Sequence, residues 1–498
     1  MRKSGILLHI TSLPTPHGIG TLGKDAYRFV DFLRAAGQSC WQILPLGPTG
    51  YGDSPYQTDS SFAGNPYLID LDLLAEEGLL TGEEIAAASM GDDPHAVDFA
   101  ALYAARWPLL RQAFRRGWSR DREAAEAFYR ENESWLRPYA LFFAAKRRFG
   151  MRPWTEWEEG LRSFPAGSDL LRWEDELRED RELCIFLQYH FYRQWDALRA
   201  YVRDSGIEII GDVPIYVPMD SADVWSEREL FELDDQCRPT EVAGVPPDYF
   251  NEDGQLWGNP LYDWKEMERR GFDWWIRRLK AAGRLYDVVR IDHFRGLESF
   301  WAVPYGDRTA RQGRWRPGPG KAFISAVRTA LPELKLIAED LGYLTPEVRE
   351  LREFSGFPGM KILQFAFDPS GDSEYLPHRI GPNSVCYCGT HDNTPLGQWL
   401  AETDEKTLAF AREYLGLNEE EGYRYGLLRA GMGCASDLFV SQMQDWLDLG
   451  TAGRMNEPGI LGCGNWCWRM DAGAAGEELA KKIARMTKLY GRGGPASK

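Results

Sequence analysis

The segment Asp287-Val-Val-Arg-Ile-Asp292 is a short apolar run that closes on a carboxylate. Two later segments share this design, Leu334-Lys-Leu-Ile-Ala-Glu339 and Val385-Cys-Tyr-Cys-Gly-Thr-His-Asp392. Short runs of this kind are typical of strands that are buried on both faces. Parallel strands present their carboxyl ends at the same edge of a barrel, so the three acids are predicted to meet there.

On either side of these segments, strand-length apolar runs alternate with amphipathic helical stretches. The runs cover about residues 5–10, 40–44, 208–210, 287–291, 334–338, 361–367, 385–388 and 439–443. This alternation predicts parallel pairing, and about eight runs favour an α/β fold with a closed (β/α)8 TIM barrel over an open doubly wound sheet. The first helix is predicted over 26–36, with Asp25 as its N-cap and Gly37 just past its end.

The 498 residues are predicted to form a single barrel, 1–498, with two insertions. About 160 residues separate the second and third runs, far more than a crossover needs. We therefore expect a mainly helical subdomain at about 70–180. A stretch rich in Gly and Pro at about 220–264 is expected to be a long loop region at the active site.

Composition argues against several classes of partner. Lys and Arg number 58 against 75 Asp and Glu, which gives a formal net charge of −17 and disfavours binding to nucleic acid or an anionic membrane. No stretch reaches the roughly 18 apolar residues of a membrane-spanning helix. Trp, Tyr and Phe make up 13% of the chain, and their flat rings suit the C–H faces of sugars.

Two further motifs have simpler explanations. Gly18-Ile-Gly-Thr-Leu-Gly23-Lys24 fits a phosphate-binding loop, but Asp25 follows where Ser or Thr should bind magnesium, so a glycine turn before a helix is favoured. The eight cysteines include no C-x-x-C pair, which is typical of buried thiols in a reducing cytosol.

The histidines beside two of the acids leave a metal site as an alternative. His293 and His391 each adjoin one acid, and a cluster of this kind at a barrel mouth can bind zinc. The first strand, however, carries only His9 rather than a His-x-His pair. Hydrogen bonding to sugar hydroxyls is therefore favoured, with no metal.

The neighbours of the acids suggest different protonation states. Arg290 and Asp292 lie two apart on a strand and share a face, so the guanidinium is expected to keep Asp292 ionised. Glu339 follows an apolar segment, where desolvation favours the protonated form. Asp212 follows another apolar run, 209–211. Retaining glycoside chemistry needs one ionised and one protonated carboxyl, about 5–5.5 Å apart.

These acid-bearing motifs resemble those of a known family. Arg290-Ile-Asp292-His293-Phe-Arg295-Gly296, Ile337-Ala-Glu339-Asp340-Leu-Gly342 and Gly389-Thr-His391-Asp392-Asn393 resemble the 4-α-glucanotransferases called amylomaltases or disproportionating enzymes, glycoside hydrolase family 77. Looser forms occur across the α-amylase clan. The resemblance covers nearly the whole chain and includes two motifs particular to the transferases, at 244–261 and Pro358-Gly-Met-Lys-Ile-Leu-Gln364.

The resemblance implies roles for individual residues. Asp292 would be the nucleophile, Glu339 the general acid/base, and Asp392 the third acid, which stabilises the transition state through sugar hydroxyls. The groups implied around the sugar at subsite −1 are Tyr56, Asp212, Arg290 and His391. Further donor and acceptor contacts are implied at Ser54, Gln255, Trp257 and Asn456.

The resemblance also implies a function. We expect a cytoplasmic enzyme without a cofactor and without a C-terminal β-domain, which transfers α-1,4-glucan segments to the 4-hydroxyl of an acceptor glucan or glucose, with retention. Its partners would be maltooligosaccharides, amylose and glycogen-derived dextrins. One alternative is an α-glucan hydrolase of the amylase clan with the same three acids. Another is a non-catalytic glucan-binding protein, which would require the loss of at least one acid.

Overall fold

All eight predicted strands pair into one closed, fully parallel barrel. The computed structural model describes residues 2–50, 52–247, 252–342, 344–462 and 464–493. Around the barrel the strands are β1 (Lys3–Leu7), β12 (Leu438–Gln442), β11 (Ser384–Tyr387), β10 (Gly359–Ile362), β9 (Lys335–Ala338), β6 (Val288–Ile291), β3 (Glu208–Val213) and β2 (Cys40–Gln42). The prediction of a TIM barrel is confirmed.

Apolar side chains fill the barrel interior. They come from alternate positions of the strands and form one buried cluster: Leu7, Cys40, Ile210, Ile337, Met360, Ile362, Val385, Tyr387 and Val440. The barrel is therefore a packed core rather than a channel, and any site must lie at one of its ends.

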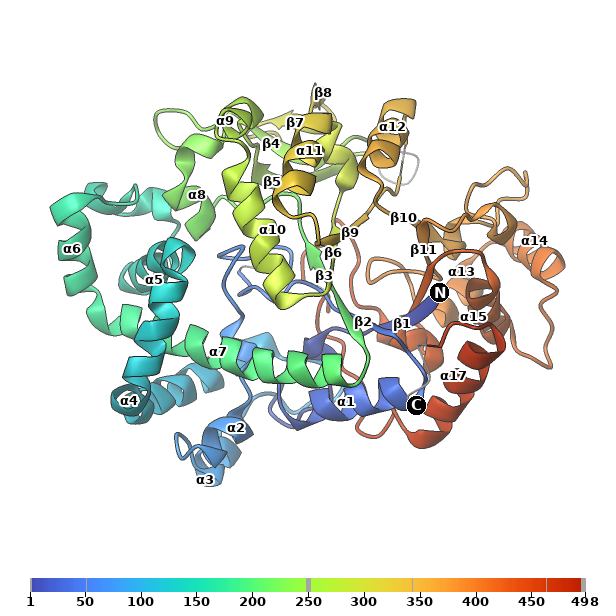
Figure 1. Cartoon of the computed structure of the whole chain (residues 1–498), viewed down its shortest axis with the longest axis horizontal. Coiled ribbons are helices and arrows are strands. Elements are labelled where there is room, and N and C mark those ends of the chain that lie inside the picture. The colour runs from blue at the N-terminus through green and yellow to red at the C-terminus, as the bar shows by residue number, and fades with distance from the viewer. Residues whose placement is uncertain (1, 51, 248–251, 343, 463, 494–498) are drawn as a thin grey trace.

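Helices surround most of the barrel (Figure 1). They include α1 (Lys24–Ala35), α10 (Asp273–Leu285), α11 (Gly320–Ala330), α12 (Pro346–Ser355), α13 (Leu396–Glu402), α14 (Glu405–Leu415), α15 (Tyr423–Gly433), α16 (Met443–Trp446) and α17 (Glu477–Leu489). In the crossover from β10 to β11, the described residues form only two 3-10 turns, η7 (Leu363–Phe365) and η8 (Pro377–Arg379).

The start of α1 differs from the prediction. Gly23 is the N-cap, and Asp25 lies within the first turn of the helix. A Cβ at Gly23 would lie 1.9 Å from Oδ2 of Asp70, so the cap position accepts only glycine. Gly37, with a φ of +66°, follows the end of the helix as predicted.

A helical insertion lies between β2 and β3, on one side of the barrel (Figure 1). It contains α2 (Leu71–Glu76), α3 (Gly82–Ala87), α4 (Phe99–Glu131), α5 (Glu133–Arg148) and α6 (Gly167–Glu176). The next helix, α7 (Arg178–Asp204), contacts α4 and α5 and also packs against α1 of the barrel. Because α7 belongs to both parts, no break in the chain separates them near residue 180.

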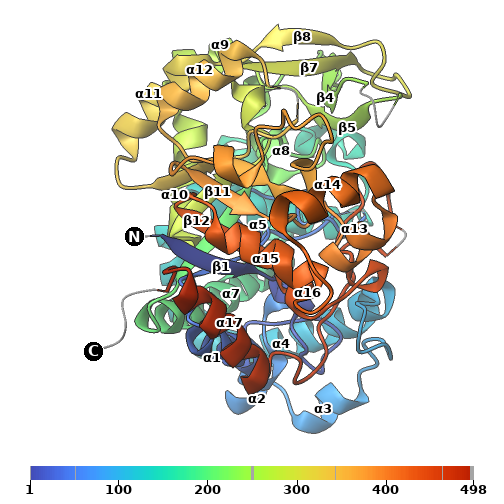
Figure 2. The same ribbon diagram turned by 90° about the vertical axis from the view of Figure 1, so that its right-hand side faces the viewer.

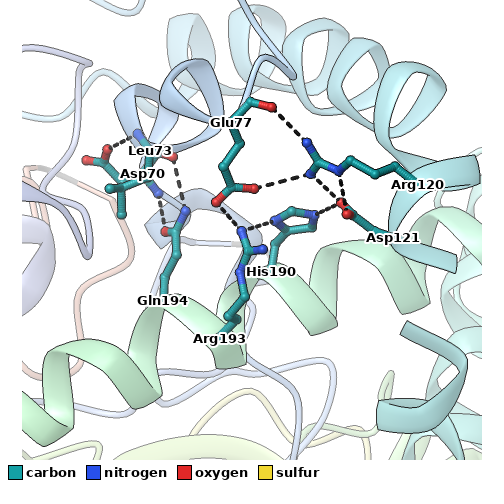
Figure 3. A network of polar contacts seen from close by, with 8 residues as sticks. All are labelled: Asp70, Leu73, Glu77, Arg120, Asp121, His190, Arg193 and Gln194. Atoms are coloured by element: carbon teal, nitrogen blue, oxygen red, sulfur yellow. Dashed lines mark hydrogen bonds and ion pairs between the residues drawn. The ribbon is translucent and has the colours of Figure 1, made fainter. Parts of the chain in front are cut away.

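A polar network ties α7 to α2 and α4 (Figure 3). The Glu77 carboxylate accepts hydrogen bonds from Arg120, over 3.3 Å, and from Arg193. Asp121 accepts from Arg120 Nε over 2.6 Å and lies 3.1 Å from Nε2 of His190, whose Nδ1 is 3.1 Å from Arg193. His190 is fully buried, so these partners take the place of water.

Residues 220–264 are more ordered than the expected loop. They contain α8 (Ala222–Ser226), β4 (Glu241–Val245), β5 (Gln255–Pro260) and the start of α9 (Trp264–Arg269). Two strands from the segment after β6, β7 (Ser299–Pro304) and β8 (Arg314–Pro317), complete a four-stranded antiparallel sheet in the order β5-β4-β7-β8. β4 and β5 pair within one segment and β7 and β8 within the other, and only the pairing of β4 with β7 joins the two segments into one sheet.

Two negative observations apply to the described part of the chain. None of its helices combines the length and the apolar character needed to cross a membrane. Its seven cysteines are all unpaired. The eighth, Cys463, lies outside the described residues.

Candidate active site

Asp292 and Glu339 occupy equivalent positions on neighbouring strands. Each directly follows its strand, β6 or β9, and these strands pair with Ile291 opposite Ala338. Neighbouring strands lie about 4.7–4.9 Å apart, which is close to the carboxyl separation of retaining glycoside hydrolases, about 5–5.5 Å. The barrel therefore brings these two predicted acids together at its mouth.

Arg290 lies between two carboxylates at the floor of the site. Its guanidinium makes an ion pair with Asp212, which stands directly opposite it on β3, and another with Asp292 over 3.0 Å. Arg290 and Asp212 are both 2% exposed. The Tyr56 hydroxyl donates a hydrogen bond to Asp212 over 2.7 Å, so the loop after β2 is tied to the same pair.

The protonation states of the two acids differ in part from the prediction. Burial raises the pKa of Glu339 to about 8, although Arg290 and the backbone N–H groups of His293 and Leu341 act in the opposite direction. Burial also raises the pKa of Asp292 to about 7, so Arg290 does not keep this pKa low as the sequence suggested. Desolvation outweighs the ion pair. Burial thus favours the protonated form of Glu339, as a general acid requires.

Asp392 approaches the site from the loop after β11. Asn456 Nδ2 donates to Asp392 Oδ1 over 2.6 Å, and His391 Nε2 lies 3.4 Å from the same oxygen. The Asp392 side chain is 39% exposed, so it remains open to a ligand. His391 is buried, which lowers its pKa and favours the neutral ring. Its ring stacks on Tyr56, with centroids 5.2 Å apart.

Among the described residues, the Ser54 side chain is linked to the site through the local turn. Its Oγ accepts a hydrogen bond from the backbone N–H of Tyr56 over 3.2 Å. The preceding residue, Asp53, has a φ of +59° and accepts a hydrogen bond from Tyr103 of α4. The helical insertion therefore supports the turn that places Tyr56.

Gln255 and Trp257 lie on β5, above the residue that follows Asp292. Trp257 Nε1 donates to Gln255 Oε1 over 3.1 Å. The indole meets the His293 ring edge-on, with centroids 4.8 Å apart. Both side chains are partly exposed, so this arm of the site is open to a ligand. Asp248, part of the family motif at 244–261, lies outside the described residues.

Two contacts within the site were not predicted from the sequence. His293 adopts the left-handed region, with a φ of 51°, and donates its backbone N–H to Glu339 over 2.6 Å. Trp466 lies against both Tyr56 and His391, with centroids 5.7 and 6.0 Å away. Only the His293 position, next to an acid, carried a signal in the sequence.

The glycine turn before α1 has a packing role. A Cβ at Gly20 would lie 1.8 Å from the carbonyl oxygen of Ile10, and one at Gly18 would lie 2.3 Å from that of Met90. These glycines therefore allow close backbone contact. Among the residues that the structure describes, no three His, Cys, Asp or Glu side chains are grouped so that they could hold a metal ion.

Comparison with known proteins identifies the family. A family model described as 4-alpha-glucanotransferase matches residues 8–474. The 4-alpha-glucanotransferase of Clostridium butyricum is 44% identical over 487 residues, 97% of this chain and 100% of that protein. The Thermus thermophilus 4-alpha-glucanotransferase is 46% identical over 502 residues, 99% of each chain.

Solved structures agree with this assignment. The amylomaltase from Streptococcus agalactiae in complex with acarbose superposes with a TM-score of 0.96 at 41% identity, covering 99% of this chain and 100% of that one. The superposition with the Corynebacterium glutamicum amylomaltase has a TM-score of 0.75 at 21% identity. It covers 99% of this chain and 74% of that chain, which shows the shared fold. This chain therefore belongs to the 4-α-glucanotransferase family, glycoside hydrolase family 77, and is an enzyme that acts on α-1,4-glucans.

Proposed function

We propose that this enzyme moves an α-1,4-glucan segment from a donor maltodextrin to the 4-hydroxyl of an acceptor glucan or glucose, by a double displacement that retains the anomeric configuration. One observation carries the proposal. Asp292 and Glu339 stand at equivalent positions on paired strands, where Arg290 makes an ion pair with Asp292 and burial raises the pKa of Glu339. Adjacent carboxyls with different protonation states are what two successive displacements need.

In the first step, the Asp292 carboxylate attacks the anomeric carbon of the donor. The bond from this carbon to the glycosidic oxygen breaks, and Glu339 gives its proton to the leaving oxygen. In the second step, the Glu339 carboxylate takes the proton of the acceptor 4-hydroxyl. That oxygen attacks the anomeric carbon and releases the Asp292 carboxylate, so both acids return to their starting states.

The surrounding residues hold the reacting sugar. Asp392 would accept hydrogen bonds from ring hydroxyls, with its orientation set by Asn456 and His391. Tyr56 would stack on the sugar at subsite −1 while its hydroxyl stays on Asp212. Arg290 balances part of the negative charge of Asp212 and Asp292 and so keeps the nucleophile in place.

The residues outside the reacting sugar would bind the rest of the chain. Trp257 offers a partly exposed ring above His293, and Gln255 fixes that ring through its side-chain oxygen. The Ser54 hydroxyl proton is available to a glucan oxygen because Oγ acts only as an acceptor toward Tyr56. The antiparallel sheet that carries Trp257 would shield the glycosyl-enzyme from water. Such shielding favours transfer over the hydrolase alternative.

The substrates would be maltooligosaccharides, amylose and glycogen-derived dextrins, in the cytoplasm. The unpaired state of the described cysteines supports a reducing compartment.

Incubation with maltotriose tests the transfer directly. We expect glucose together with a ladder of oligosaccharides longer than maltotriose, resolved by length. When labelled glucose is added, products of every length should include molecules that carry the label at the reducing end, because glucose then serves as an acceptor beside maltotriose. Only glucose and maltose, with no product longer than the substrate, would identify a hydrolase instead.

A further inference from the structure

The antiparallel sheet has two different faces. Ala243, Phe300 and Ala302 are at most 2% exposed and pack into the main core. The neighbouring positions point the opposite way, because successive side chains alternate across a strand. On β5, Leu256 therefore projects from the face opposite to that of Gln255 and Trp257, away from the substrate site.

This outward face carries a row of side chains that crosses all four strands. Leu256 stands opposite Gly244, Gly244 opposite Trp301, and Trp301 opposite Trp315. We call these four residues the outer row. Trp315 is 42% exposed, Leu256 is 38% exposed and Trp301 is partly exposed. β7 and β8, which carry the two indoles, lie at one extreme of the molecule in Figure 2.

The two indoles of the outer row are held in place without a ligand. Their centroids are 5.2 Å apart in an edge-to-face arrangement. Trp301 Nε1 donates to the carbonyl oxygen of Ala310 over 2.8 Å. The Arg295 guanidinium lies 3.9 Å from the Trp315 centroid. A ligand that stacks on Trp315 would therefore lose little free energy in ordering the ring.

The chemistry around the outer row fits a sugar chain. Charged groups lie beside the apolar strip. Arg311 makes an ion pair with Asp253 over 2.7 Å, next to Ala310, whose carbonyl accepts the Trp301 hydrogen bond. A pyranose ring has an apolar C–H face that can stack on an indole, and its rim of hydroxyls can bond to such charged groups. A stable protein interface buries roughly 800 Å² of surface on each partner. The three partly exposed side chains of the outer row expose far less surface than this, so a sugar chain fits the outer row better than a protein partner.

We propose that the outer row is a second binding site for α-1,4-glucan, separate from the reaction centre, which holds the part of a long chain that extends beyond it. The row begins at Leu256 on β5, which carries Gln255 and Trp257 on its other face. Because β5 is the edge strand of the sheet, a chain that passes round this edge would reach both faces. The proposal rests on the activity toward α-glucans proposed above. It predicts that long and short donors depend differently on Trp315.

Trp315→Ala tests this dependence. Loss of one stacking contact should lower kcat/KM for long amylose roughly two- to tenfold. The value for maltotriose, which is too short to span both surfaces, should change less than twofold. Trp315→Phe keeps a flat ring and should recover much of the loss. The matched control is Phe354→Ala on α12, since this ring is also exposed, at 39%, and lies over a cation, Lys321. It should affect neither donor.

A second measurement does not depend on activity. In a native gel that contains amylopectin, with acarbose present to fill the reaction centre, the wild type should be retarded and Trp315→Ala should migrate faster. Equal retardation of the two would overturn the proposal. So would an equal loss of kcat/KM with both donors, or a wild-type dimer that Trp315→Ala dissociates. If maltotriose gives no product longer than itself, the proposed transfer reaction is refuted. Gel retardation would still test whether the outer row binds glucan.

Discussion

In the proposed mechanism, Asp292 is the nucleophile on which both steps of the reaction depend. In Asp292→Asn, an amide cannot form the glycosyl ester, so we expect turnover of maltotriose to fall by about three orders of magnitude or more. The fold should persist because the amide can still accept a hydrogen bond from Arg290. Binding of acarbose by calorimetry should therefore survive. Turnover near the wild-type rate, in a preparation free of other glucosidases, would refute the assignment of the nucleophile.

In the proposed mechanism, Glu339 acts only in steps that move a proton. Fluoride leaves without protonation, so Glu339→Gln should still transfer the sugar of α-maltosyl fluoride to Asp292 while turnover of maltotriose collapses. A glycosyl-enzyme should then accumulate and be visible as added mass on the intact protein. Equal loss with both donors would show that Glu339 is not the acid.

His293 affects Glu339 through its backbone. The left-handed conformation directs its N–H at the Glu339 carboxylate, and this hydrogen bond lowers the pKa of Glu339. Asn tolerates this conformation and a β-branched residue does not. His293→Val should lose the hydrogen bond and raise the Glu339 pKa, so the alkaline limb of kcat/KM for maltotriose should move to higher pH. His293→Asn, which also lacks the ring, should leave the limb in place. Identical profiles for the two variants would contradict this role.

At the scale of elements, α7 joins the helical insertion to the barrel through His190. Burial lowers the pKa of this histidine from 6.5 to about 4, despite the opposing effects of Glu77 and Asp121. The folded state therefore prefers the neutral ring. This preference contributes up to about 3 kcal/mol to the free energy of unfolding. The contribution is complete above pH 6.5 and is lost as the pH falls from 6.5 to 4.

His190→Gln measures this contribution. An amide can replace both hydrogen bonds of the ring, to Asp121 and from Arg193, without titrating. The free energy of unfolding by denaturant, measured at several pH values, should decline less steeply for the variant than for the wild type below pH 6.5. A constant difference between the two proteins from pH 7 to pH 4.5 would show that His190 does not titrate on unfolding.

For the whole molecule, the carboxylate mechanism predicts activity without metal. A divalent cation beside Asp292 would compete with Arg290 and withdraw charge from the nucleophile. Prolonged dialysis against EDTA, checked by elemental analysis, should therefore leave both the transfer activity and the melting temperature unchanged. Activity that disappears with the metal and returns with zinc would overturn the mechanism, because attack by a metal-bound water would invert the configuration.

The arrangement of the whole molecule explains why the acids could be found from the sequence. Each acid follows a strand that is buried on both faces, and such a strand shows itself as a local apolar run. In a closed parallel barrel all these runs end at the same mouth. The order of the eight strands and the meeting of Asp292 with Glu339 therefore follow from local patterns and from one topological rule.

The sequence by itself thus determined the barrel, the mouth at which the acids meet and the family, while tertiary structure decided the rest. The pairs β4–β5 and β7–β8 become one four-stranded sheet only because β4 meets β7, and backbone hydrogen bonds between distant segments leave no local pattern. Gly23 replaces Asp25 as a cap because of Asp70, a residue remote in sequence. The raised pKa of Asp292 reflects burial by many segments at once, and desolvation is a property of the assembled site that no single segment encodes.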